Sequence, residues 1–142
     1  MARATTGRTV IIEIDPASPT PPYEQIRGQL ATMIATGAMP PGAHLPSIRQ
    51  LAADLGIAAN TVARAYRELE LVGLVASRVR HGTTVTATPP TLAPTEIHRR
   101  LDDAARTYVT TAHQLGVGAD EAAEAIRTAL RTSRPDRPGA DR

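Results

Sequence analysis

Residues 47–73 read SIRQLAADLGIAANTVARAYRELELVG, and we expect this stretch to decide the fold. Apolar residues recur at helical spacing after Ser47, a good N-cap, and the pattern stops at Gly56. A second helical pattern begins near Ala59 and ends at Gly73. A short helix, a turn with glycine and a longer second helix make a helix-turn-helix. The stretch therefore predicts two helices that pack at a fixed angle.

The second of these helices carries polar side chains suited to the major groove of DNA. Its buried face is expected to hold Val62, Ala65, Tyr66, Leu69 and Val72, with Tyr66 in the core rather than stacked on a base. Its other side presents Asn60, Thr61, Arg64, Arg67 and Glu68. Asn can bond adenine with two hydrogen bonds, Arg can bond guanine, and Thr can contact phosphate or a thymine methyl. We expect base reading, or the contacts nearest to it, from Arg49, Asn60 and Arg64.

A basic hairpin follows the second helix. Residues 74–76 and 84–86 are short strand-like runs, joined by residues 77–83 with a turn-forming glycine. Its DNA-binding candidates are Arg78, Arg80, His81, Gly82 and Thr83. Phosphate contacts, which set register rather than sequence, are expected from Ser47, Thr61, Arg67, Arg80 and Thr83. Arg64 and Arg67 have a second interpretation as solvated helix residues, with Arg67 paired to Glu68 or Glu70.

The rest of the chain divides into short segments. We expect an N-terminal arm over residues 1–19, with a strand at 10–14 and disorder over 1–9. The winged helix-turn-helix domain covers residues 20–86, starting with a helix that has apolar positions at Tyr23, Ile26, Leu30, Met33 and Ile34. A Pro/Thr linker covers residues 87–95, two helices lie within 96–132, and the tail 133–142 is expected to be disordered. The fold class is thus mainly α with a small β-wing.

The two C-terminal helices are expected to form a homodimer. The first spans about residues 96–115, and the second runs from an N-cap at Asp120 to about Thr132. Their apolar stripes are close to coiled-coil spacing and comprise Ile97, Leu101, Ala104, Tyr108, Ala112, Leu115, Ile126 and Leu130. Two helices alone make a poor core, so the stripes need a partner; the alternative is that they fold back on their own winged domain. Any small-molecule effector would bind at the dimer interface or linker, and the sequence identifies none.

Composition narrows the function classes. Residues 44–86 hold five Arg against three acidic residues, which accounts for the whole net charge of +2. All basic residues are Arg, which suits phosphate and guanine but equally reflects a GC-rich genome. Cys is absent, no apolar run approaches a membrane span, and no leader pattern opens the chain, so we expect a cytoplasmic protein. We find no nucleophile motif, phosphate loop or cofactor site, and His98 with Asp102 lacks a third metal ligand, so we expect no enzyme.

Several stretches resemble the GntR (gluconate repressor-like) family of transcriptional regulators. They are PGAHLPSIRQLA at residues 41–52, LGIAANTVARAYRELE at 55–70, PYEQI at 22–26, GLV at 73–75 and GTTV at 82–85. The resemblance implies a winged helix-turn-helix that binds palindromic operators as a dimer, with DNA contacts at Arg49, Thr61 and Gly82. The NTVARAY run and the short two-helix tail further resemble the YtrA subfamily. Its members typically repress their own operon, often one that encodes an ABC transporter.

Two positions depart from the family pattern. Ala58 and Ala59 stand where the family often has Ser and a basic residue, which removes an N-cap hydroxyl. The wing usually reads Gly-x-Gly, and His81 occupies a place that is often small or glycine. Two other function classes remain: a winged helix that contacts protein without DNA, and a remnant of the aminotransferase-linked branch. That branch needs a Schiff-base Lys, and this chain has no Lys.

Overall fold

The computed structural model describes residues 2–6 and 10–133, which form five helices and four strands. The chain divides into two compact units, the first ending at Leu92 and the second beginning at Ala93. The first unit is a winged helix-turn-helix and the second a pair of helices, as the sequence predicts. No helix in the described part of the chain is long and apolar enough to cross a membrane.

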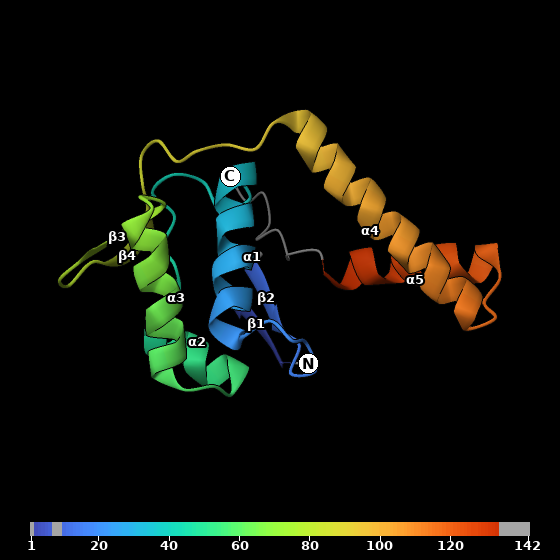
Figure 1. Ribbon diagram of the computed structural model, residues 1–142, viewed down its shortest axis with the longest axis horizontal. Helices are drawn as coiled ribbons and strands as arrows, with labels where there is room; N and C mark the ends of the chain where they lie inside the picture. The colour runs from blue at the N-terminus through green and yellow to red at the C-terminus, as the bar shows by residue number, and fades with distance from the viewer. Residues whose placement is uncertain (1, 7–9, 134–142) are drawn as a thin grey trace, which may run out of the picture. The chain divides into compact units, whose positions relative to one another are not determined.

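Three helices enclose the core of the first unit (Figure 1): α1 (Pro22–Thr36), α2 (Ile48–Leu55) and α3 (Ala59–Leu71). Helix α1 begins with proline in its first turn, where the missing N–H is tolerated, and a left-handed Gly37 ends it. Ile26, Leu30 and Ile34 lie four residues apart and are at most 1% exposed. Burying a side chain of this size stabilises the fold by about 1.5–3 kcal/mol.

The hairpin of β3 (Val75–Arg78) and β4 (Gly82–Val85) is the wing, and Figure 1 shows it projecting away from α3. Its antiparallel register pairs Val75 with Val85 at the base and Arg78 with Gly82 at the tip. The two valines are buried in the core, whereas the tip residues are exposed. The apolar base therefore attaches the hairpin to the helices and leaves its basic tip in solvent.

The N-terminal arm is more ordered than we expected. Strand β1 (Ala2–Thr6) pairs antiparallel with β2 (Val10–Ile14), so the disorder expected for residues 1–9 is wrong for residues 2–6; residues 1 and 7–9 lie outside the described part. Arg3 lies directly opposite Glu13 and donates from Nε to its carboxylate at 2.7 Å. Opposite charges facing each other across strands stabilise the pairing. Ile12 and Ile14 on β2 are buried in the core of the unit.

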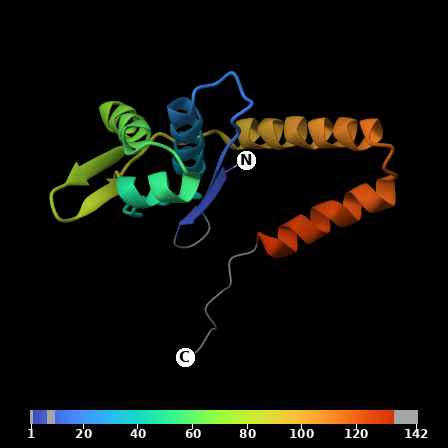
Figure 2. The ribbon, with the colours of Figure 1, turned by 90° about the horizontal axis from the view of Figure 1, so that it is seen from below.

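The second unit consists of α4 (Pro94–Gln114) and α5 (Ala119–Thr132), which Figure 2 shows as a helical hairpin. Helix α4 begins two residues earlier than expected because Pro94 suits the first turn. The expected cap at Asp120 is wrong: Gly118 is the N-cap, and Asp120 lies in the first turn, where an acidic side chain favours the helix dipole. The expected linker is also bound at its end, since Leu92 N donates to Ala35 O at 2.9 Å. The disorder expected for residues 133–142 is wrong for Ser133, the C-cap of α5, whose N–H donates to Ala129 O at 2.9 Å; residues 134–142 lie outside the described part.

Candidate nucleic-acid interface

The N-terminus of α2 is joined to the wing. The Ser47 side chain caps α2 by accepting from Gln50 N at 3.1 Å. Just before it, residues 42–45 run beside β4: Leu45 N donates to Thr83 O at 2.9 Å, and Val85 N donates to Ala43 O at 2.9 Å. This pairing could not be predicted, because residues 38–46 have the proline- and glycine-rich composition of a turn. The pairing fixes the Ser47 end of α2 beside Thr83 of the wing.

Helix α3 is fixed to the same segment from the other side. Tyr66 is 4% exposed, and its hydroxyl donates to the Pro46 carbonyl at 2.7 Å. Burial raises the pKa of the Tyr66 phenol, so the hydroxyl stays protonated and able to donate. The prediction that Tyr66 belongs to the core is confirmed. Pro46, directly before Ser47, is thus hydrogen-bonded to α3. The residues that precede Pro46 are hydrogen-bonded to β4.

The outer face of α3 is exposed to solvent. Asn60, Arg64 and Arg67 are exposed and Thr61 is half-buried, while Val62, Ala65, Tyr66 and Leu69 face the core as expected. The expected burial of Val72 is wrong: Val72 is the C-cap, beyond the last helical residue, and is 65% exposed. Ala58 is the N-cap and provides no side-chain hydrogen bond, which agrees with the departure noted in the sequence. Leu71 is 81% exposed at the end of the helix and is therefore a surface leucine.

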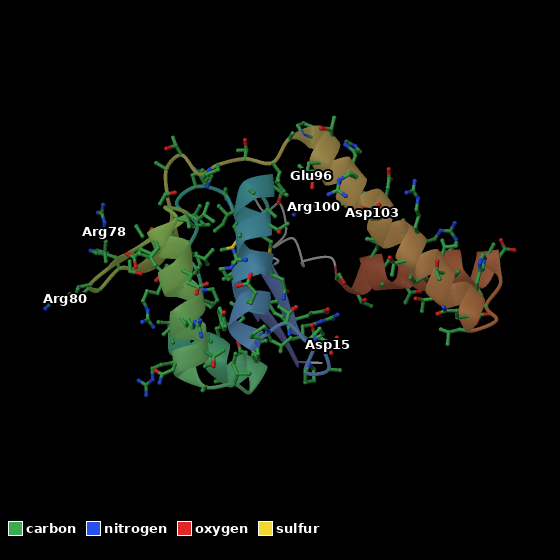
Figure 3. The ribbon with its side chains drawn as sticks, in the orientation of Figure 1. Asp15, Arg78, Arg80, Glu96, Arg100 and Asp103 are labelled. Atoms are coloured by element: carbon green, nitrogen blue, oxygen red, sulfur yellow. The ribbon has the colours of Figure 1, made fainter. Side chains whose placement is uncertain are left out.

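The arginines of this face fall into two groups. Arg49, Arg67, Arg78 and Arg80 are exposed and have no carboxylate partner among the described residues. Figure 3 shows Arg78 and Arg80 on the hairpin, directed away from the helices. The alternative interpretation, in which Arg67 pairs with Glu68 or Glu70, is wrong: Glu68 lies beside Arg64 and Arg27, and Glu70 accepts from Ser77 N at 3.3 Å. Unpaired guanidinium groups are free to bind phosphate or guanine.

Arg64 belongs to the second group and already has two partners. Its Cζ lies 3.7 Å from the ring centroid of Tyr23, and its Nε lies 3.7 Å from Glu68 Oε1. The i, i+4 spacing of Arg64 and Glu68 is visible in the sequence, but the contact with Tyr23 joins α3 to α1 and depends on tertiary packing. Arg64 nevertheless remains on the exposed face, with 57% of its side chain accessible.

The wing tip has an unusual backbone. Arg80 has φ of 71° and Gly82 has φ of 73°. The residue before His81 and the residue after it therefore both adopt the left-handed conformation that favours glycine. We expected the departure from Gly-x-Gly at His81; the backbone places it at Arg80. A non-glycine residue in this region costs about 1–2 kcal/mol. His81 N donates to Arg78 O at 3.1 Å and closes the turn. Thr83, another expected phosphate contact, is half-buried, with its hydroxyl 2.9 Å from that of Ser77.

The second unit contains the residues expected to form the dimer. Ala112 is 7% exposed, and the Tyr108 hydroxyl donates to Ala122 O at 2.8 Å, so both pack within the helix pair. The remaining apolar positions of the stripes are more open: Ile97 is half-buried and Ala104 exposed, while Leu101, Leu115, Ile126 and Leu130 are 66%, 73%, 41% and 65% exposed. The helix pair therefore leaves large apolar side chains uncovered.

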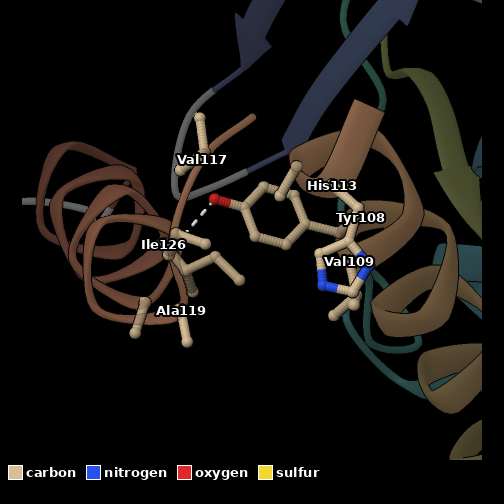
Figure 4. A pocket seen from close by; sticks show the side chains of 9 residues that line it. Tyr108, Val109, His113, Val117, Ala119 and Ile126 are labelled. Carbon is tan, nitrogen blue, oxygen red and sulfur yellow. Dashed lines mark hydrogen bonds between the residues drawn. The ribbon is translucent and has the colours of Figure 1, made fainter. Parts of the chain in front are cut away.

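An apolar pocket of about 270 Å³ lies between α4 and α5 (Figure 4). Its lining consists of Tyr108, Val109, Ala112, His113, Val117, Ala119, Ala122, Ala123 and Ile126. Pockets that bind drug-sized ligands are roughly 300–1,000 Å³ and combine apolar walls with a few polar groups.

His98, one of the two residues considered as a metal pair, has its Nδ1 2.7 Å from Pro94 O of its own helix. No cluster of three metal-ligating side chains occurs within residues 2–6 and 10–133.

Comparison with known proteins agrees with this geometry. The family of bacterial regulatory proteins called gntR matches residues 22–85. The HTH-type transcriptional regulator Rv1152 of Mycobacterium tuberculosis is 41% identical over 111 residues, which cover 78% of this chain and 87% of that protein. The HTH-type transcriptional repressor YtrA of Bacillus subtilis is 34% identical over 117 residues, covering 82% and 90%.

Among solved structures, YtrA from Sulfolobus acidocaldarius, a GntR-family transcription factor, is 34% identical with a TM-score of 0.50. The match covers 68% of this chain and 97% of that one. These relatives are named as transcriptional regulators, not as enzymes, and they align with most of the chain. The chain therefore belongs to the GntR family of DNA-binding transcriptional regulators and is homologous to its YtrA members.

Proposed function

We propose that this regulator is a repressor that binds a palindromic operator as a homodimer. One observation carries the proposal: α2, α3 and the wing present exposed arginines that have no carboxylate partner within residues 2–6 and 10–133. These elements are hydrogen-bonded to one another through residues 42–46. Such an arrangement keeps the cations in fixed relative positions and free to bind. As part of the same proposal, the protein acts in the cytoplasm on chromosomal DNA.

In this proposal α3 enters the major groove. Helix-turn-helix proteins contact base edges with residues near the start of the second helix, and Asn60 lies at the second position of α3. Arg67 lies two turns further along the exposed face, and Arg49 lies at the second position of α2. We assign base reading to Arg49 and Asn60, with Arg67 and Thr61 on phosphate or base edges.

Ser47 and the wing provide the remaining contacts of the proposed interface. The N-terminus of α2 offers backbone N–H groups to a phosphate beside Ser47. Arg78, Arg80 and His81 extend from the hairpin toward an adjacent groove, and Gly82 with Thr83 sets the turn that carries them. Each phosphate neutralised by such a cation makes binding more sensitive to salt.

The homodimer forms, in this proposal, through α4 and α5. Leu101, Leu115 and Leu130 are each about two-thirds exposed or more, and covering them with a second copy removes this apolar surface from water. A two-fold dimer would place two α3 helices on inverted half-sites. Repression is supported by the name of the Bacillus subtilis relative, which is a transcriptional repressor. The target that the subfamily resemblance implies is the operon that encodes the present regulator, including ABC-transporter genes.

The proposal is tested by selecting bound duplexes from a random-sequence library and then footprinting the protein on the region upstream of its own gene. We expect inverted repeats whose half-sites are about 10–10.5 base pairs apart or a multiple of that spacing. Reduced transcription from a promoter that contains the footprint would support repression. No enriched sequence, or a footprint confined to one half-site, would contradict the palindromic operator.

The dimer is tested by sedimentation of the full chain with Leu115→Ala and the matched Leu71→Ala. Both leucines are more than 70% exposed, but only Leu115, the C-cap of α4, belongs to the second unit. We expect Leu115→Ala to weaken self-association and Leu71→Ala to leave it unchanged. Equal effects, or a monomer at every concentration, would contradict the proposed interface.

A further inference from the structure

Five side chains form a continuous contact between the start of α1 and the middle of α3. Tyr23 stacks on Arg64, whose Nε faces one oxygen of Glu68 at 3.7 Å. The other oxygen of Glu68 lies 3.8 Å from Arg27 Nε. Arg27 in turn donates from Nε to Glu24 at 2.9 Å. The chain of contacts crosses twice between the two helices, so it joins them through side chains outside the apolar core.

The charges in this contact compensate one another. Two arginines face two glutamates, and the hydrogen bond from Arg27 holds the pKa of Glu24 below its usual value and raises that of Arg27. The exposed arginines Arg49 and Arg67 differ, since neither has a carboxylate partner among the described residues. Arg64 therefore resembles Arg27 in having a glutamate beside its guanidinium, and it differs in this from Arg49 and Arg67.

The geometry points to Arg64 as a positioning residue, which holds α3 at its working angle against α1, while Arg67 faces the duplex. The inference rests on the proposed function, because its test measures affinity for duplex DNA. It assigns Arg64 a role other than base reading. One face of its guanidinium is covered by the Tyr23 ring, and the Nε edge is turned to Glu68. A guanine contact through the Nε edge would require Arg64 to leave Glu68.

At an exposed site, the interaction between a cation and the face of an aromatic ring changes an equilibrium constant by about two- to fivefold. If the contact holds α3 in the orientation that fits the groove, its loss lowers the fraction of binding-competent protein by about that factor, and the apparent affinity falls with it. No phosphate contact is lost, so the dependence of affinity on salt stays the same.

The test uses full-length variants and the duplex obtained by selection from a random library. Arg64→Lys keeps the charge but loses the planar group, and Tyr23→Leu removes the ring. We expect each to lower affinity for the selected duplex about two- to fivefold at an unchanged salt slope and an unchanged affinity for scrambled duplex. Tyr23→Phe keeps the ring and should bind within twofold of the parent chain. A purely structural loss would lower the melting temperature without changing the ratio of specific to non-specific affinity, and would overturn the inference.

A double-variant measurement separates positioning from direct contact. If Arg64 acts through Tyr23, Arg64→Gln costs little once Tyr23→Leu is present. If Arg64 reads a base, Arg64→Gln costs as much in either background and relaxes selection at one base position, which would overturn the inference. Arg67→Ala should instead lower the salt slope by about one charge. Failure of the parent chain to bind any duplex would refute the proposed function itself and is distinguishable from these outcomes.

Discussion

Replacing Tyr66 with Phe isolates the hydrogen bond that joins α3 to the start of α2. The Tyr66 hydroxyl donates to Pro46 O at 2.7 Å, and both residues are buried. The substitution removes the donor, leaves the ring in place and strips a buried carbonyl of this partner. An unsatisfied buried acceptor costs about 1–3 kcal/mol of folding free energy.

The expected change in thermal stability follows from this cost. For a domain of 60–100 residues, each kcal/mol lowers the melting temperature by roughly 4–8 °C. Tyr66→Phe should therefore melt at least about 4 °C below the parent chain, measured by circular dichroism. Affinity for DNA should also fall at temperatures where the variant is folded, because Ser47 and Arg49 follow directly from Pro46.

Tyr23→Phe is the matched control, since Tyr23 is half-buried and its hydroxyl has no hydrogen-bond partner among the described residues. It should change the melting temperature by less than Tyr66→Phe. Equal melting temperatures for Tyr66→Phe and the parent chain would refute the reasoning, because the carbonyl would then not depend on this donor.

Further predictions concern the turn, the caps and the charges. Gly82→Ala should destabilise the fold by about 1–2 kcal/mol from its φ of 73° alone, since an added Cβ meets no atom within 4 Å. Gly28→Ala, in the middle of α1, also adds a Cβ that meets no atom within 4 Å, and it should stabilise the fold by about 0.5–1 kcal/mol. If urea unfolding showed that both substitutions change the free energy of unfolding in the same direction, the backbone argument would be contradicted. Ser47→Ala should cost about 1 kcal/mol through its cap, read by the same titration, whereas no loss would show that the cap is dispensable. Hydrogen bonds from Arg99 and Arg100 lower the pKa of Glu96 from 4.5 to about 2, so its stabilisation of α4 is present above pH 4.5 and lost as pH falls toward 2. The helicity lost in Glu96→Gln should accordingly vanish at acid pH; a loss that persists there would not be electrostatic.

The helix-turn-helix could be predicted because its signals are local. Caps and apolar spacing placed α2 and α3 within a residue or two. Four of the predicted buried residues, Val62, Ala65, Tyr66 and Leu69, are buried, whereas Val72 follows the end of the helix and is exposed. The expected face of α3 was also right, since Asn60, Arg64 and Arg67 are all exposed.

Non-local contacts account for what the sequence did not reveal. Strand β1 is stabilised by a partner, and Arg3 has Glu13 opposite only once the hairpin has formed. Arg64 and Tyr23 lie 41 positions apart along the chain, so helical periodicity could not indicate that they are in contact. At the wing tip the glycine-like conformation falls on Arg80, a position that no propensity marks as left-handed.

The central claim is that the exposed arginines of α2, α3 and the wing bind duplex DNA. The most direct measurement is the affinity of Arg49→Ala for the selected duplex over a range of salt concentrations, together with its footprint. Arg106→Ala on α4, which removes the same charge from an 80% exposed side chain, is the control. The account predicts a loss of about 5- to 150-fold for Arg49→Ala, from a base contact worth roughly 1–3 kcal/mol, and no loss for Arg106→Ala. An unchanged footprint and affinity for Arg49→Ala would contradict it.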